Sequence, residues 1–80
     1  MKLPRDITGA ELAKALVDLG YHTTRQAGSH MRLTTFENGE HHITIPAHSP
    51  LKIGTLAAIL SDLESHHKLS RDALLKLLFY

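Results

Sequence analysis

The residues best suited to chemistry in this sequence are a histidine, His30, which follows a glycine-serine turn, and two arginines near it. The turn, Gly28-Ser29, separates two segments with β-branched and aromatic residues, which predicts a tight hairpin with His30 at the start of its second strand. Histidine exchanges protons near neutral pH more readily than other side chains. Held on a strand beside Arg25 and Arg32, it can act on a phosphate group. The alternative is that Gly28-Ser29 is only a turn and His30 an ordinary surface histidine.

Histidine is unusually frequent, with seven in 80 residues. Five lie in the middle of the chain, at His22, His30, His41, His42 and His48. The pair His41-His42 falls in a predicted strand, where neighbouring side chains point to opposite faces and cannot easily share one metal ion. There is no cysteine and no His-Glu-x-x-His sequence. We therefore expect no metal and no other cofactor, and we expect His66 and His67 to lie at the solvated end of a helix.

Two kinds of RNA chemistry fit the middle of the chain. A Ser-His nucleophile is disfavoured, because Ser29 and His30 are sequence neighbours and cannot readily activate one another. RNA carries its own nucleophile, the 2′-hydroxyl group, so its cleavage needs only a base, an acid and cations for the phosphate. A histidine can supply either proton transfer. The other possibility is binding without cleavage, in which a sheet and loop contact double-stranded RNA by its shape and 2′-hydroxyl groups.

The composition indicates a single small domain of 80 residues, of which 42% are hydrophobic. Nine Lys and Arg against eight Asp and Glu give a net charge of +1, which is not the basic excess of a protein that binds nucleic acid by bulk electrostatics. No apolar run approaches the ~20 residues that span a bilayer. Residues 1–6 lack the apolar segment of a signal peptide. We expect a cytoplasmic protein with no membrane partner.

The first helix has start and stop signals. Thr8 and Glu11 have the spacing of a capping box. An apolar face with helical spacing follows from Leu12 to Leu19, and Gly20 is a natural C-terminal stop. These signals predict a helix between Thr8 and Gly20.

Alternation decides which strand residues face the core. In the second and third strands, the residues placed inward are Met31, Leu33, Ile43 and Ile45. The residues placed outward are His30, Arg32, Thr34, His42 and Thr44. A three-residue loop at 37–39, with Gly39 in the left-handed conformation, pairs Leu33 with Ile43 and Thr34 with His42, so that inward residues oppose inward ones.

The face of the first strand stays open between two alternatives. A two-residue turn at Gly28-Ser29 puts Arg25 on the outward face with His30. A three-residue turn puts Tyr21 and Arg25 inward, which suits an aromatic side chain at position 21.

The second half of the chain predicts two helices. Ser49 or Thr55 can cap the first of them, whose apolar stripe comprises Leu51, Ile53, Leu56, Ile59, Leu60 and Leu63. A polar link is expected at 64–68. Ser70 can cap a short last helix at about 70–78, which packs on the core through Leu74, Leu77 and Leu78.

This order of elements predicts an α+β fold of two layers, with a three-stranded antiparallel sheet, two main helices on one face and a short C-terminal helix. The whole chain, 1–80, forms one domain with its core at about 7–63. The other face of the sheet is expected to stay open.

Four motifs in series give the sequence a resemblance to a known family. They are Gly20-Tyr21, Arg25-x-x-Gly28-Ser29-His30, Ile43-Thr44-Ile45-Pro46-x-His48 and Leu51-Lys52-x-Gly54-Thr55-Leu56-x-x-Ile59-Leu60. Together they resemble the HicA (YcfA-like) toxins, which are small messenger-RNA interferases of type II toxin–antitoxin systems. The resemblance covers residues 8 to 63.

The resemblance implies a fold like the double-stranded RNA-binding domain, cleavage of mRNA without a metal, and inhibition by a HicB-type antitoxin. It implies that His30, the histidine of Gly-Ser-His, is the catalytic acid or base. Candidate RNA contacts are Arg25, Ser29, Arg32, His42, His48, Lys52 and Thr55. One departure is that Ala57 and Ala58 follow Gly54-Thr55-Leu56, where the family often has a basic residue. The alternative function is a non-catalytic RNA-binding module.

Overall fold

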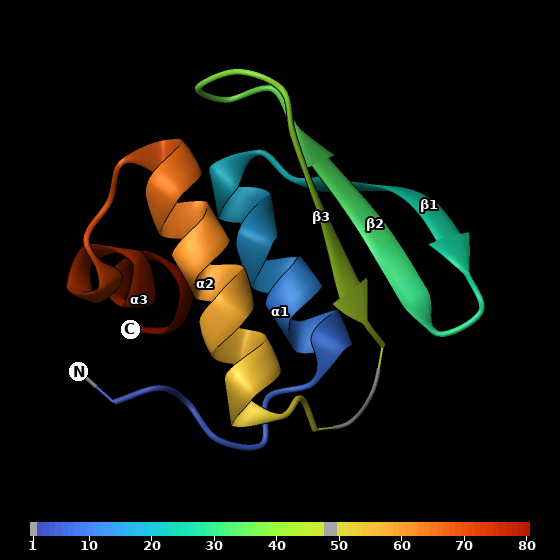
Figure 1. Ribbon diagram of the computed structural model, residues 1–80, viewed down its shortest axis with the longest axis horizontal. Coiled ribbons are helices and arrows are strands. Elements are labelled where there is room, and N and C mark those ends of the chain that lie inside the picture. The colour runs from blue at the N-terminus through green and yellow to red at the C-terminus, as the bar shows by residue number, and fades with distance from the viewer. Residues whose placement is uncertain (1, 48–49) are drawn as a thin grey trace.

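The computed structural model describes residues 2–47 and 50–80. Its elements, in chain order, are α1 (Gly9–Ala15), the 3₁₀ helix η1 (Leu16–Leu19), β1 (His22–Ala27), β2 (His30–Thr35), β3 (His41–Pro46), α2 (Ile53–His67) and α3 (Arg71–Phe79). The three strands form one antiparallel sheet in the order β1-β2-β3. Helices α1 and α2 lie side by side against it, and α3 packs beyond α2 (Figure 1). The predicted α+β fold is therefore confirmed.

Helix α1 begins as its sequence predicts. The backbone N–H of Glu11 donates to the Thr8 hydroxyl oxygen at 3.0 Å, and the N–H of Thr8 donates to the Glu11 carboxylate at 2.9 Å. The backbone N–H of Thr8, and to a smaller extent its hydroxyl group, lower the pKa of the Glu11 carboxyl group, because hydrogen bonds to the carboxylate favour its charged form. The helix tightens to 3₁₀ geometry at Leu16 and ends at Gly20, which has a φ of 78°.

Glycine at position 9 lets α1 approach the end of β3 very closely. A Cβ atom there would lie 2.0 Å from the backbone oxygen of Pro46 and 3.1 Å from the Cα of Ala47. No side chain fits in that space, so only glycine permits this packing. Since Pro46 is the cross-strand partner of His30, the contact also fixes the strand end beside His30.

The predicted register between β2 and β3 is confirmed. Leu33 pairs with Ile43, Thr34 pairs with His42, and His30 pairs with Pro46. In the connecting loop Gly39 has a φ of 101°, as expected, and Asn38 also has a positive φ, of 59°. Hydrophobic alternation was therefore a sufficient guide to this hairpin.

The first hairpin combines features of both alternatives that the sequence left open. Its turn has two residues, because Ala27 pairs with His30, and Gly28 adopts a φ of 57°. Arg25 consequently pairs with Arg32 on the outward face. A β-bulge between Thr23 and Arg25 then shifts the alternation by one residue. Tyr21 therefore still points into the core, where it is fully buried.

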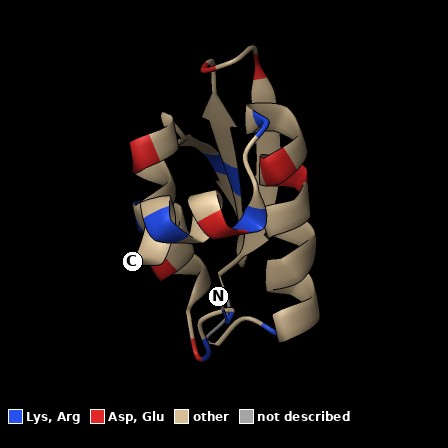
Figure 2. Cartoon of the chain, turned by 90° about the vertical axis from the view of Figure 1, so that its left-hand side faces the viewer, with Lys and Arg blue, Asp and Glu red and all other residues tan. Residues whose placement is uncertain are grey.

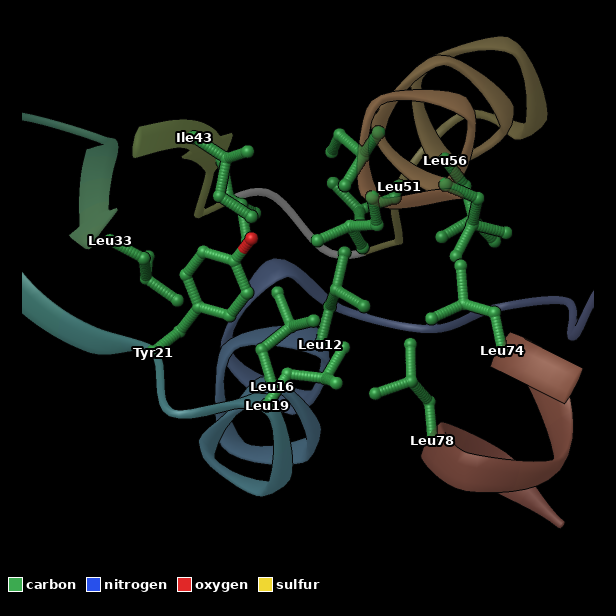
Figure 3. Packing of buried hydrophobic residues seen from close by; sticks show 14 of the residues in the cluster. Leu12, Leu16, Leu19, Tyr21, Leu33, Ile43, Leu51, Leu56, Leu74 and Leu78 are labelled. Carbon is green, nitrogen blue, oxygen red and sulfur yellow. The ribbon is translucent and has the colours of Figure 1, made fainter. Parts of the chain in front are cut away.

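The core fills the space between the sheet and the helices (Figure 3). Its buried hydrophobic residues are Leu12, Leu16, Leu19, Tyr21, Met31, Leu33, Ile43, Ile45, Leu51, Leu56, Ile59, Leu60, Leu63, Leu74, Leu75 and Leu78. Two expected core residues are wrong: Ile53 is 48% exposed and Leu77 is 44% exposed. Ile53, the first residue of α2, lies between the buried residues Leu51 and Leu56 but on the exposed side of the helix, and on α3 the buried position is taken by Leu75 instead.

The bounds of α2 differ from the prediction at both ends. Lys52 occupies the N-cap without a side-chain hydrogen bond, so Thr55 lies inside the first turn and the prediction that it caps the helix is wrong. The other predicted cap, Ser49, lies outside the described residues. At its C-terminus the helix continues through the expected polar link to His67, and Lys68 ends it with a φ of 54°. This extra turn carries His67 into the core and leaves His66 half-buried beside it.

Helix α3 begins as predicted, with the Ser70 hydroxyl accepting from the N–H of Ala73 at 3.1 Å. An ion pair between Arg71 and Glu64 attaches it to α2. Within residues 2–47 and 50–80, no helix combines the length and the hydrophobicity needed to cross a bilayer.

Candidate functional site

The outer face of the sheet, which is the face turned away from α1 and α2, carries most of the predicted site residues. Its side chains lie in three cross-strand rows. The rows, each running from β1 to β3, are Ala27, His30 and Pro46; Arg25, Arg32 and Thr44; and His22, Thr34 and His42. No helix of the described chain covers this face (Figure 1).

Two arginines face each other in the middle row. Arg25 and Arg32 are cross-strand partners, both are exposed, and neither forms an ion pair with a carboxylate among the described residues. Like charges directly opposite one another destabilise a sheet. A bound anion between them would relieve that repulsion, as a phosphate does for paired guanidinium groups. The side of the molecule that carries α3, in contrast, has acidic and basic residues interspersed (Figure 2).

His30 begins β2 in the row next to this arginine pair. It is exposed, and its ring forms no hydrogen bond with any residue in the described part of the chain. Its backbone is held firmly nonetheless, because the N–H of Ala47 donates to the carbonyl oxygen of Ser29 at 2.5 Å and so extends the ladder past the strand end. Both ring nitrogens of His30 are therefore available to a ligand, and Ser29 lies exposed beside it.

His42 has a different environment from His30. The Thr34 hydroxyl donates to its Nδ1 at 2.7 Å, and its Nε2–H donates to the Glu40 carboxylate at 2.7 Å. Both ring nitrogens thus already have protein partners. Since four residues of strand separate His42 from Pro46, the partner of His30, the two histidines lie about 13 Å apart along the sheet. They cannot exchange protons with one phosphate.

Two further predicted RNA contacts lie near the His30 end of the face. Lys52 and Thr55 line a hollow of about 270 Å³ together with Pro46, and Pro46 is the cross-strand partner of His30. The last candidate, His48, lies outside the described residues. The described structure therefore places Arg25 and Arg32 in the row next to His30, with Ser29 just before it in the chain, and sets His42 apart. Lys52 and Thr55 share a hollow with Pro46, the cross-strand partner of His30.

The structure also contains a polar cluster that the sequence interpretation missed. His67, predicted to be solvated, is 8% exposed, and its Nε2 lies 2.9 Å from the Tyr21 hydroxyl oxygen. The same oxygen lies 2.6 Å from Nδ1 of His41, whose Nε2 lies 3.1 Å from the Asp62 carboxylate. The second ring nitrogen of His67, Nδ1, lies 3.1 Å from the Asn38 amide nitrogen.

These contacts define the direction of each hydrogen bond. An amide nitrogen can only donate, so Nδ1 of His67 accepts from Asn38. The proton of neutral His67 then lies on Nε2 and is donated to Tyr21, whose O–H donates to His41. His41 in turn donates to Asp62. Every member is satisfied while the histidines are neutral, which stabilises this buried polar cluster.

Burial and charge shift two pKa values in the cluster. Burial, followed by the neighbouring charges of His66 and His41, lowers the pKa of His67 despite the opposing effect of Glu37. Burial, with smaller effects from Asp62 and Glu37, raises the pKa of Tyr21. Both groups are therefore held neutral near pH 7.

His66 attaches the loop between β2 and β3 to the end of α2. Its Nε2–H is shared by the carbonyl oxygens of Glu37 and Gly39, at 3.0 and 3.1 Å. Its ring stacks on that of His41, with centroids 4.2 Å apart and planes inclined by 14°. The sequence did contain a signal for this arrangement, because His67 continues the helical spacing of Leu56, Leu60 and Leu63 by one turn.

The neighbours His41 and His42 point to opposite faces of β3, as predicted, since one contacts Tyr21 and the other Thr34. Across the part of the chain that the structure describes, no group of three or more His, Asp or Glu side chains is arranged to hold a metal ion.

Comparison with known proteins identifies the family of this chain. A family model described as HicA toxin of bacterial toxin–antitoxin matches residues 9–64, a span that runs from the start of α1 into α2 and includes the whole sheet. No curated protein and no solved structure gives a match. Because the matched span covers well over half of the 80 residues, this chain belongs to the HicA family of toxins from toxin–antitoxin systems.

Proposed function

We propose that this toxin is an mRNA interferase, an endoribonuclease that acts in the cytoplasm with His30 as general acid or base and is neutralised by a HicB-type antitoxin. The observation that carries the proposal is the contrast between the two outer-face histidines of β2 and β3. His30 has two free ring nitrogens beside a pair of unneutralised arginines, whereas both nitrogens of His42 are engaged.

The reaction proposed for this site uses the RNA's own nucleophile. His30, as base, accepts the proton of a 2′-hydroxyl group, whose oxygen attacks the adjacent phosphorus atom. The bond from phosphorus to the 5′ oxygen breaks, and that oxygen takes up a proton from water. The products are a 2′,3′-cyclic phosphate and a 5′-hydroxyl end, and no metal is required. Arg25 and Arg32 stabilise the negative charge that develops on the phosphate oxygens.

The second candidate function is an RNA-binding module without activity. It is favoured by the separation of about 13 Å between His30 and His42, which sets His42 too far from His30 for the two to share the proton transfers at one phosphate. In this case the arginine pair and the hollow at Lys52 would hold RNA, and no bond would break.

Induced expression in a bacterial host distinguishes the two. If the chain is an mRNA interferase, the wild-type chain should stop growth and cleave cellular mRNA into shorter fragments. His30→Ala should abolish both effects at equal protein level, and co-expression of the HicB-type protein should restore growth. Growth arrest without mRNA cleavage, unchanged in His30→Ala, would favour the binding module.

A further inference from the structure

The end of the outer face farthest from His30 carries an exposed aromatic ring, Phe36. The cross-strand partners of β2 and β3 continue in register to Thr35 and His41, so the next opposed positions are Phe36 and Glu40. Glu40 lies on the outer face, because its carboxylate binds Nε2 of His42 at 2.7 Å. Alternation along β2 likewise places Phe36 on the face of Thr34 rather than that of Thr35.

The Phe36 side chain is neither buried nor stacked on another ring in the part of the chain that the structure describes. At 74% it is the most exposed large hydrophobic side chain of the described residues. His42, which lies two residues after Glu40 on the same face, presents a second ring. Its nitrogens are bound by Thr34 and Glu40, so its orientation is fixed while its side chain stays 35% exposed.

We propose that Phe36 and His42 together form a stacking platform for an unpaired base of the RNA. This inference rests on the proposed function, since it assigns the part of the substrate that lies beyond the cleavage site. Aromatic rings bind bases of single-stranded RNA by stacking, whereas the bases of a duplex are already stacked and paired.

The charges of the outer face agree with this division. Arg25 and Arg32 lie between His30 and the platform and attract the sugar–phosphate backbone. Glu40, which lies opposite Phe36 on this face, repels phosphate groups but leaves a neutral base unaffected. From His30 to Phe36 the face extends about 20 Å along β2, which gives the backbone and the base separate positions on it.

The test measures RNA binding with His30→Ala present in every variant, so that the RNA stays intact. The probe is a short single-stranded RNA with one 2-aminopurine base, whose fluorescence is quenched by stacking, and the same RNA annealed to its complement is the comparison. Phe36→Leu keeps an apolar side chain without a ring, and Phe36→Tyr keeps the ring. Val17→Ala is the matched control, because Val17 is an exposed hydrophobic residue (54%) on the helical side of the molecule.

We expect Phe36→Leu to weaken single-strand binding by about 5- to 150-fold, the effect of one lost base–aromatic stack, and to abolish the quenching. Phe36→Tyr and Val17→Ala should bind like the parent, and Phe36→Leu should not alter binding of the duplex. The proposed platform is wrong if Phe36→Leu binds single-stranded RNA and quenches 2-aminopurine like the parent. It is also wrong if Phe36→Leu weakens binding of the HicB-type antitoxin but not binding of RNA. If the His30→Ala parent binds no RNA at all, the proposed function fails with it.

Discussion

Replacing Tyr21 with phenylalanine tests the buried polar cluster most sharply, because it removes one oxygen atom and leaves the ring. That oxygen accepts from His67 at 2.9 Å and donates to His41 at 2.6 Å, and Tyr21 itself is fully buried. Phenylalanine fills nearly the same volume, so the loss of hydrogen bonds is the main effect.

The expected cost follows from the two partners that are left behind. The Nε2–H of His67 becomes a buried donor without an acceptor, which costs about 1–3 kcal/mol. His41 is only half-buried, so water can replace the lost donor there and the remaining cost is about 0.5–1 kcal/mol. We therefore expect a destabilisation of about 1.5–4 kcal/mol, or a fall in Tm of roughly 6–30 °C for a domain of this size.

Urea denaturation at pH 8, followed by circular dichroism, measures this cost while the histidines are neutral. Tyr80→Phe is the matched control, because Tyr80 is 69% exposed and its hydroxyl donates only to the Lys2 carbonyl oxygen at 3.3 Å. It should change the free energy of unfolding by less than about 0.5 kcal/mol. An equally small change in Tyr21→Phe would show that the cluster contributes nothing to stability.

Three further perturbations have defined outcomes. The pKa of His67 is lower in the folded chain than in the unfolded chain, so the unfolded state binds more protons as the pH falls. The free energy of unfolding should therefore be highest above pH about 6.5 and decrease below it. His67→Gln should flatten this part of a plot of urea midpoint against pH. Gly9→Ala places a Cβ atom 2.0 Å from the Pro46 oxygen and should lower the free energy of unfolding, measured by thermal denaturation, by about 1–3 kcal/mol. Gly54→Ala, whose Cβ atom would have nothing within 4 Å, is the control and should be neutral or stabilising by up to ~1 kcal/mol. Equal effects of the two changes would contradict the packing of α1 on β3. Arg32→Gln removes one of two facing cations, so the free energy of unfolding should stay the same or rise slightly. The slope of the logarithm of the RNA-binding constant against the logarithm of the salt concentration should fall in magnitude by about 0.7 for single-stranded RNA. An unchanged slope would mean that Arg32 contacts no phosphate.

The parts of the fold that were predictable depend on short-range patterns. The Thr8–Glu11 capping box involves residues three apart, and the β2–β3 register follows from alternation across one loop. Each has a local cause that a single sequence reveals. The candidate face was predictable for the same reason, because alternation alone placed His30, Arg32 and His42 together on it.

The parts that were not predictable depend on contacts between distant segments. The bulge before Arg25 lets Tyr21 enter the core while Arg25 stays outside, and neither turn length alone gave that result. The bond between Tyr21 and His67 joins residues 46 positions apart. The sequence did not predict it, because 64–68 was expected to be a polar link after the helix, whereas α2 continues one turn further and buries His67.

The central claim is that His30 transfers a proton during RNA cleavage. The most direct measurement is cleavage of single-stranded RNA by the purified chain in the presence of EDTA, with His30→Ala compared against His22→Ala. His22 is the matched control, because it is also exposed on the outer face without a hydrogen-bond partner in the described chain.

We expect the wild-type chain to produce 2′,3′-cyclic phosphate ends, His30→Ala to cleave about 10²- to 10⁴-fold more slowly, and His22→Ala to match the wild type. A 2′-deoxy substitution at the cleaved nucleotide should block the reaction. Cleavage by His30→Ala at the wild-type rate, or intact RNA with the wild-type chain, would contradict the claim.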